Sequence, residues 1–309
     1  MTTKLPTDWL TGCATALVTP FAKDGAVDDA TMRALVRRQL DGGVRLLVPC
    51  GTTGEGATLS ADEQRRVIGL TVEAARGRGR VIAGVGTNDT AEVVRRAKAA
   101  VEIGADAVLV VSPYYNKPTQ AGLIAHFRAV AAAVPRTPVV LYNVPGRTAS
   151  NVSAQTTLQL AREVTNVVAT KEASGNLSQI MAILRDRPDG FRVLSGDDAV
   201  TIPLIALGAD GVISVAANEM PDLMSRMTEL ALDGRVDDAR EIHYRLLALM
   251  EANFLESNPG PVKAVMAMMG LLEETLRLPL VPVQESTRAT LRAVLQEIDV
   301  LPSAAHAAS

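Results

Sequence analysis

One lysine stands where lysine is rarely found, at the end of an apolar run. Residues 167–170 read Val-Val-Ala-Thr, which is typical of a short buried strand, and Lys171 follows directly. Lysines make up only six of the 31 basic residues, so a cation needed merely for solubility is usually an arginine in this chain. Burial among apolar strands disfavours the charged ammonium form. Because a neutral amine attacks carbonyl groups, Lys171 suggests Schiff-base chemistry.

The alternative is a structural lysine whose amine reaches the rim of the sheet and pairs with an acid. Glu172 and Asp197 are the candidate partners. Two features favour the catalytic interpretation. Three of the four tyrosines and a Thr-Thr pair also follow apolar runs. Hydroxyl groups of this kind relay protons, so they suit a reacting lysine better than a structural one.

Further side chains at the ends of apolar runs complete a candidate site. Tyr142 could carry protons to and from a Schiff-base intermediate, although a core tyrosine with one satisfied hydroxyl is the common alternative. The turn "GTTGEG", residues 51–56, lacks the Lys-Ser/Thr ending of a nucleotide-binding loop, so its amides and hydroxyls suit a carboxylate. Arg147, after the Pro-Gly turn of "YNVPGRT", could hold a second carboxylate through two hydrogen bonds.

Metal chemistry has little support in the sequence. The histidines, His126, His243 and His306, are far apart and lack the spacing of metal ligands. Asp197 and Asp198 are more simply explained as a helix N-cap and a first-turn acid. We therefore expect no metal site.

The elements that must position these residues are short strands alternating with helices. Most of the apolar runs are continuous, as in strands buried on both faces of a parallel sheet. The stretches between them open on Asp or Thr, and several close on glycine, as capped helices do. This order predicts an α/β fold, a (β/α)8 TIM barrel, with a doubly wound sheet as the alternative. The runs are residues 13–21, 45–50, 80–86, 107–115, 138–145, 167–173, 191–196 and 211–217.

In a TIM barrel all the residues singled out above lie at one end, because active sites form at the carboxyl ends of the strands. Beyond about residue 220 the strand pattern stops. Helical patterns follow over residues 222–234, 236–256 and 261–274. We therefore expect a barrel over residues 1–220 and a C-terminal helical extension over residues 221–309.

Composition excludes several classes of function. A net charge of -3 and a pI near 5.7 offer no footprint for nucleic acid. No apolar run is long enough to span a membrane, and the first residues lack the apolar core of a secretory signal. Cys13 and Cys50 lie in apolar runs, as reduced core cysteines do. These features predict a cytoplasmic enzyme.

The motifs "GTTGE", "SPYYNKP", "YNVPGRT", "KEASGNL" and "LSGDD" occur in the order and spacing of one known family. By them the chain resembles the dihydrodipicolinate synthase family, pyruvate-dependent class I aldolases related to N-acetylneuraminate lyase. The resemblance covers nearly the whole chain, including the later "NPGPVKA". It implies condensation of pyruvate with L-aspartate 4-semialdehyde, without a cofactor, because the lysine is the electron sink.

The resemblance also implies catalytic roles. Lys171 would form the Schiff base with pyruvate, and Tyr142 would donate and accept protons. Thr52 and Tyr115 would complete the proton relay, with Tyr115 reaching in from a neighbouring subunit. The smallest competent unit would then be a dimer, and homotetramers are usual in the family.

Substrate binding is implied for a second set of residues. Thr53, Gly196 and the backbone of Ile213 would bind pyruvate. Arg147 would bind the carboxylate of the semialdehyde at the mouth of the pocket. This arginine is the more specific signal, because the related sugar-acid lyases generally lack it.

Feedback control is a further implication. Lysine-inhibited relatives bind L-lysine at the dimer interface, and this chain matches them at Asn88, Glu92 and Tyr114. Where the sensitive enzymes have a serine and two histidines, the corresponding residues here are Gly56, Ala61 and Gln64. Because two of these three cannot donate a side-chain hydrogen bond, we expect weak or absent inhibition by L-lysine.

Two other functions compete with the synthase. One is an aldolase of the same superfamily that acts on a 2-oxo sugar acid, and Arg147 argues against it. The other is a barrel that binds a metabolite as a sensor or scaffold. A site that no longer catalyses a reaction would have no reason to keep the four catalytic residues, which are Lys171, Tyr142, Thr52 and Tyr115.

Overall fold

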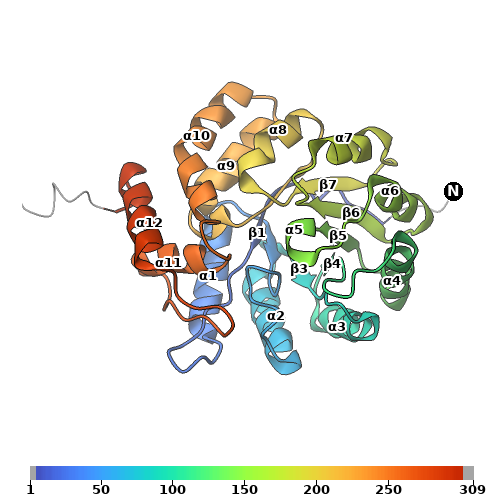
Figure 1. Cartoon of the computed structure of the whole chain (residues 1–309), viewed down its shortest axis with the longest axis horizontal. Helices are drawn as coiled ribbons and strands as arrows, with labels where there is room; N and C mark the ends of the chain where they lie inside the picture. The colour runs from blue at the N-terminus through green and yellow to red at the C-terminus, as the bar shows by residue number, and fades with distance from the viewer. Residues whose placement is uncertain (1–4, 302–309) are drawn as a thin grey trace, which may run out of the picture.

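Eight parallel strands close into a barrel that helices surround (Figure 1). The computed structural model describes residues 5–301. Each strand pairs with the next one along the chain, and β8 returns to pair with β1. The predicted TIM barrel is therefore confirmed, and the doubly wound alternative is wrong. The strands are β1 Gly12–Ala16, β2 Leu46–Val48, β3 Arg80–Gly84, β4 Ala107–Val111, β5 Val139–Asn143, β6 Val167–Glu172, β7 Arg192–Ser195 and β8 Gly211–Ser214.

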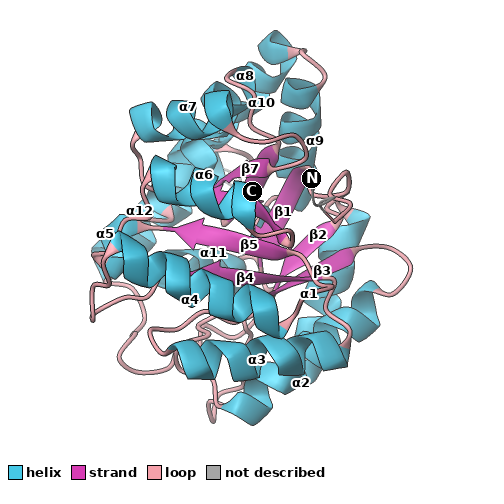
Figure 2. Ribbon diagram, turned by 90° about the vertical axis from the view of Figure 1, so that its right-hand side faces the viewer, coloured by secondary structure: helices cyan, strands magenta, loops and turns pink. Residues whose placement is uncertain are grey.

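Helices connect the strands and cover their outer faces (Figure 2). Two short 3-10 helices, η1 Asp198–Val200 and η2 Ala216–Asn218, follow β7 and β8. The α-helices are α1 Asp29–Asp41, α2 Ala61–Ala75, α3 Thr90–Ile103, α4 Gln120–Ala133, α5 Pro145–Thr148, α6 Ala154–Glu163, α7 Leu177–Asp186, α8 Thr201–Ala206, α9 Pro221–Leu232, α10 Val236–Ala252, α11 Gly260–Met268 and α12 Glu285–Glu297.

Side-chain caps begin six of the twelve α-helices in residues 5–301. Asp89 precedes α3, and its side chain accepts a hydrogen bond from the amide of Ala91. Gly104 ends α3 in the left-handed conformation, φ 105°, which glycine adopts at little cost. The helix expected over residues 261–274 stops earlier, at Met268. Gly270, φ 72°, turns the chain away shortly afterwards.

Alternation along the strands sorts side chains between the barrel interior and the helical layer. A cluster that includes Ala14, Leu46, Ile82 and Leu194 fills the interior. A larger cluster lies between the strands and the surrounding helices. The interior is therefore a packed apolar core, and a polar side chain among its inward-facing positions stands out.

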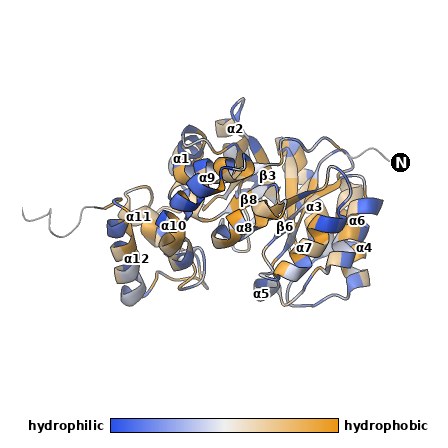
Figure 3. Cartoon of the chain, turned by 90° about the horizontal axis from the view of Figure 1, so that it is seen from above, coloured by the Kyte–Doolittle hydropathy of each residue, from blue (hydrophilic) through white to orange (hydrophobic). Residues whose placement is uncertain are grey.

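The first of the C-terminal helices packs on the barrel strands, and the later ones lie further from them. Helix α9 packs against β1 and β8, as the other barrel helices pack on their strands, and α10 packs on α9. Helices α11 and α12 pack together and lie with α10 to one side of the barrel (Figure 3). We propose a boundary between barrel and extension at residue 220, with α9 as the helix of the extension that packs on the barrel strands.

Two other expectations concern the ends and the membrane. His306, one of the three histidines considered above, lies outside the described residues. Among helices of the described chain, none combines the length and apolarity that crossing a bilayer requires.

Candidate active site

The barrel places Lys171 and Tyr142 side by side. They are register partners on the adjacent strands β6 and β5, so both side chains point to the same face of the sheet. Lys171 is 5% exposed, and its Nζ lies 4.4 Å from the centroid of the Tyr142 ring. Lys171 is thus held at the inner rim of the barrel, against an aromatic face.

The structural alternative for Lys171 is not observed. Within residues 5–301, Lys171 takes part in no salt bridge. Glu172, the next residue along the strand, accepts hydrogen bonds from Asn143 and from the amide of Ser174. Asp197 caps η1 by accepting from the amide of Ala199. Both acids that were candidate partners are therefore engaged elsewhere, and the amine of Lys171 has no anionic partner there.

The Glu172 network holds the register that positions the site. Asn143 and Glu172 are register partners on the outward face, one position beyond Tyr142 and Lys171. Asn143 Nδ2 donates to Glu172 at 3.1 Å, and its Oδ1 accepts from the amide of Val152 at 2.9 Å. Burial raises the pKa of Glu172, and the hydrogen bonds from Ser174 and Asn143 oppose that shift. The network ties the ends of β5 and β6 together.

Gly196 follows β7 and leaves room for the lysine. A Cβ atom at this position would lie 2.6 Å from the Ala173 Cβ and 3.1 Å from the Lys171 Cε. Its amide donates to the Glu172 carbonyl at 2.8 Å. A side chain at Gly196 would therefore clash with Ala173 and press on Lys171, which explains why glycine stands there.

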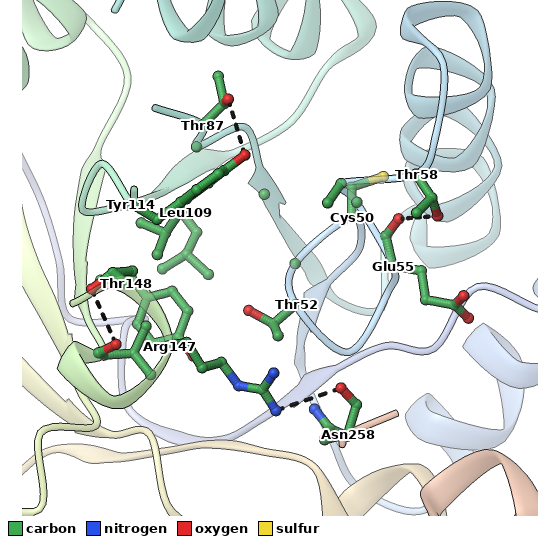
Figure 4. A pocket seen from close by; sticks show the side chains of 18 of the residues that line it. Cys50, Thr52, Glu55, Thr58, Thr87, Leu109, Tyr114, Arg147, Thr148 and Asn258 are labelled. Atoms are coloured by element: carbon green, nitrogen blue, oxygen red, sulfur yellow. Dashed lines mark hydrogen bonds between the residues drawn. The ribbon is translucent and has the colours of Figure 1, made fainter. Parts of the chain in front are cut away.

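Two cavities open beside these residues. A cavity of about 150 Å³ surrounds Lys171, and a second of about 460 Å³ extends from it toward Tyr114 (Figure 4). Five residues line both and so mark where they meet, namely Thr52, Tyr142, Val144, Arg147 and Asn258. The predicted proton donor, a relay hydroxyl and the predicted carboxylate-binding arginine thus converge on one space.

Asn258 and Phe254, from the C-terminal helical region, complete the small cavity, and the sequence argument had not singled them out. Asn258 Nδ2 donates to Thr53 Oγ1 at 2.9 Å. The backbone carbonyl of Asn258 accepts from Arg147 Nη2 at 3.5 Å, as Figure 4 shows. The only signal for Asn258 was its place at the start of "NPGPVKA". Nothing in its neighbourhood along the chain indicates that it meets Thr53.

Two predicted residues lie apart from the cavities. Tyr115 is 87% exposed, with φ 72°, and lines neither cavity. Ile213 is buried inside the barrel, and Val215, two residues further on, is the β8 neighbour that reaches the small cavity. Within one chain the structure therefore assembles Lys171 and Tyr142 but leaves Tyr115 outside.

Two of the predicted effector residues, Asn88 and Tyr114, both contact the Thr87 hydroxyl. Tyr114 lines the larger cavity, and its hydroxyl lies 3.3 Å from Thr87 Oγ1. The carbonyl of Asn88 accepts from Asn116. Glu92 lines a third cavity, of about 170 Å³, where its carboxylate pairs with Arg95 and Arg96. The charge of Glu92 is therefore already neutralised by residues of its own helix.

Comparison with known proteins identifies the family. The sequence profile of the dihydrodipicolinate synthetase family matches residues 9–298. The chain belongs to this family. A 4-hydroxy-tetrahydrodipicolinate synthase from Koribacter versatilis is 54% identical over 296 residues, which are 96% of this chain and 98% of that protein. The predicted family, the lyase class of enzyme and the predicted synthase function are thereby confirmed.

Solved structures agree with this family assignment. Dihydrodipicolinate synthase from Aquifex aeolicus superposes with a TM-score of 0.92 at 44% identity, covering 95% of this chain and all of that one. The enzyme from Cyanidioschyzon merolae, whose structure was solved with lysine bound, gives 0.92 at 41% identity over 95% of this chain and 99% of that one. The family's fold and the barrel described above are the same.

Proposed function

We propose that this enzyme condenses pyruvate with L-aspartate 4-semialdehyde through a Schiff base on Lys171. The observation that carries the proposal is a buried lysine without an anionic partner among the described residues. It opens into a cavity that Tyr142, Thr52 and Arg147 share. An amine in this setting needs little desolvation to act as a nucleophile.

The proposed reaction proceeds in successive steps that use Lys171 and Tyr142. The Lys171 amine attacks the keto carbon of pyruvate, and water leaves as the imine forms. Loss of a proton from the pyruvyl methyl group gives an enamine, with Tyr142 as the group placed to move protons. The enamine carbon attacks the aldehyde carbon, and the aldehyde oxygen takes up a proton. The amino group of the second substrate then attacks the imine carbon, which closes the ring and releases Lys171.

Each substrate carries a carboxylate, and the site has two positions at which a carboxylate can bind. We propose that the Thr52–Thr53 turn and Gly196, with the backbone near Ile213, bind the pyruvyl carboxylate. Arg147 lies on α5 at the junction of the two cavities. Its exposed guanidinium can bind the carboxylate of the semialdehyde through paired, charge-assisted hydrogen bonds. The aldehyde would then lie between Arg147 and Lys171.

We propose that the active unit is at least a dimer, and that two dimers form a homotetramer. An exposed Tyr115 supports the dimer, because a partner that covers it would bring its hydroxyl to a second site. Leu177 and Met181, exposed on α7, offer an apolar patch for a further contact between copies. We place the enzyme in the cytoplasm, where its buried free thiols Cys13 and Cys50 stay reduced.

Replacing Arg147 by alanine tests the second-substrate assignment. Losing hydrogen bonds worth roughly 1.5–3 kcal/mol should raise the KM for the semialdehyde about 10- to 100-fold. Trapping of the pyruvate imine with borohydride should stay at the level of the unmodified enzyme. The measurement is a coupled assay in which each substrate is varied in turn.

Arg162→Ala is the matched control, because within residues 5–301 the side chain of this exposed arginine on α6 donates only to the Asp186 carbonyl. It should leave both substrates unaffected. If Arg147→Ala instead weakened use of pyruvate and semialdehyde equally, the role of Arg147 would be structural and the assignment would be wrong.

Inhibition by L-lysine should be weak or absent. Glu92 accepts from Arg96 Nε at 2.6 Å, so an incoming ammonium would have to compete with that arginine. Gln64 is buried, and its amide donates to the Gly56 carbonyl at 2.8 Å, which removes it as a replacement contact. Losing even one hydrogen bond to a charged ligand weakens binding about tenfold or more.

The measurement is a titration of lysine into the coupled assay at subsaturating pyruvate. Half-inhibition at submillimolar lysine would contradict the expectation. Arg96→Ala removes one of the two arginines that pair with Glu92 and should increase sensitivity. Restoring a side chain at Gly56 is not a useful variant, since a Cβ there would lie 2.2 Å from the Cys50 carbonyl oxygen.

A further inference from the structure

A second lysine, Lys263 on α11, is buried more deeply than Lys171. Its side chain is 0% exposed, and its Nζ donates to Glu55 and, at 2.9 Å, to the Thr275 carbonyl. The same ammonium lies 4.3 Å from the centroid of the Phe21 ring. Lys263 thus joins two parts of the fold that are 208 residues apart in the chain. The reaction proposed above does not use it.

Glu55 belongs to the turn that carries Thr52 and Thr53. It has a left-handed backbone, φ 51°, which is strained for a residue other than glycine. Its amide donates to the Thr52 carbonyl at 3.1 Å, so the conformation of Glu55 is linked to that of Thr52. The second carboxylate oxygen of Glu55 accepts from the amide of Arg277 at 3.1 Å. The carboxylate is therefore held by two contacts from the C-terminal region.

The other end of the turn is held from the same region. Thr53 Oγ1 accepts from Asn258, which lies five residues before Lys263. Both Thr52 and Glu55 line the larger cavity, and Figure 4 shows the Glu55 carboxylate extending away from Thr52. That carboxylate contacts Lys263 on α11 and the amide of Arg277. Movement of α11 relative to the barrel would therefore displace the turn.

Stability alone gives little reason for an ion pair here. Desolvation lowers the pKa of Lys263, and the charge of Glu55 opposes that shift. Replacing such a buried pair by apolar side chains of similar volume often leaves stability unchanged or increases it. A directional pair, unlike apolar contact, fixes one orientation of the turn.

We propose that the Glu55–Lys263 pair is a positioning device that fixes the Thr52–Thr53 turn against Lys171, and that α11 thereby acts on pyruvate binding. The inference rests on the proposed function for its kinetic consequence. Its structural consequence, a turn that loosens when the pair is removed, does not depend on the reaction.

The test compares Glu55→Gln, Lys263→Met and the double variant. Each single variant leaves one buried group unpaired, whereas the double variant removes both charges and so should recover much of the stability lost by Lys263→Met. If the pair positions the turn, the double variant should still raise the KM for pyruvate and slow borohydride trapping. A displaced turn should raise the KM for pyruvate about 10- to 100-fold, whereas the KM for semialdehyde should change by no more than about twofold.

Arg192→Met is the matched control. Arg192 pairs with the buried Asp210 at the opposite end of the barrel, where β7 begins. It should lower stability without changing the ratio of the two KM values. A double variant that folds and keeps unmodified pyruvate kinetics, or that loses both substrates equally, would overturn the inference.

Amide hydrogen exchange separates this inference from the proposed function. Exchange of residues 51–58 should accelerate in the double variant while that of β6 stays unchanged. If pyruvate failed to form an adduct with the unmodified enzyme, the proposed function would fail, and the exchange result would still decide whether the pair holds the turn. Unchanged exchange at residues 51–58 would count against positioning.

Discussion

Borohydride reduction in the presence of pyruvate should add one pyruvyl-derived group per chain, on Lys171. The amine lies in the small cavity, is buried, and has no salt bridge within residues 5–301, so forming the neutral nucleophile breaks no ion pair there. Lys263 is buried too, but its amine is engaged by Glu55. Peptide mapping of the reduced adduct is the measurement. An adduct on Lys117 or Lys263, or none at all, would show that the mechanism is wrong.

Lys171→Arg should lower kcat by on the order of 10³-fold or more, although it keeps the positive charge. A guanidinium stays protonated and cannot form the imine. Lys117→Arg is the matched control, because Lys117 is exposed and lines neither cavity. Substantial activity in Lys171→Arg would mean that the lysine acts through its charge, and a Schiff base would be excluded.

Mixing inactive Tyr115→Phe chains with inactive Lys171→Ala chains should restore activity. Tyr115 is exposed and lies outside the two cavities of its own chain, so the relay role proposed for its hydroxyl requires a site on another copy. In a twofold dimer each site would combine Lys171 of one chain with Tyr115 of the other. Random mixing in equal amounts then leaves about one quarter of all sites complete.

Tyr142→Phe mixed with Lys171→Ala is the matched control and should restore nothing. Tyr142 and Lys171 share one barrel, so a hybrid never contains a site with both residues intact. Hybrids are separated by charge tags on one chain, and their activity is compared with that of either parent. Hybrids that form but stay inactive with Tyr115→Phe would contradict a shared site.

The fold could be predicted from the sequence because its cause is local. Continuous apolar runs are needed wherever a strand is covered on both faces, and they recur at most strands of the barrel. Caps such as Asp89 and Gly104 set helix ends through contacts within a few residues. The predicted helix end was wrong where the sequence carried no clear stop signal. The helix expected to reach residue 274 ends at Met268. There the helical pattern continues beyond the point where the backbone turns.

Part of the site could also be predicted from the sequence. Lys171 and Tyr142 follow apolar runs, and a parallel barrel gathers the carboxyl ends of its strands at one rim. Sequence spacing thus sufficed to bring the two side chains together. Their contact, with the amine facing the aromatic ring, needed the register between β5 and β6, which no local pattern specifies.

Only the tertiary structure revealed what holds the Thr52–Thr53 turn. Asn258 and Lys263 reach it across more than 200 residues, and neither has a neighbourhood that identifies its partner. The structure likewise decided that Tyr115 is exposed while Tyr142 faces Lys171, because in the sequence both tyrosines come at the end of an apolar run. Residue type and period determine which face a side chain takes. Which distant residue meets it depends on how the closed barrel and its C-terminal helices pack.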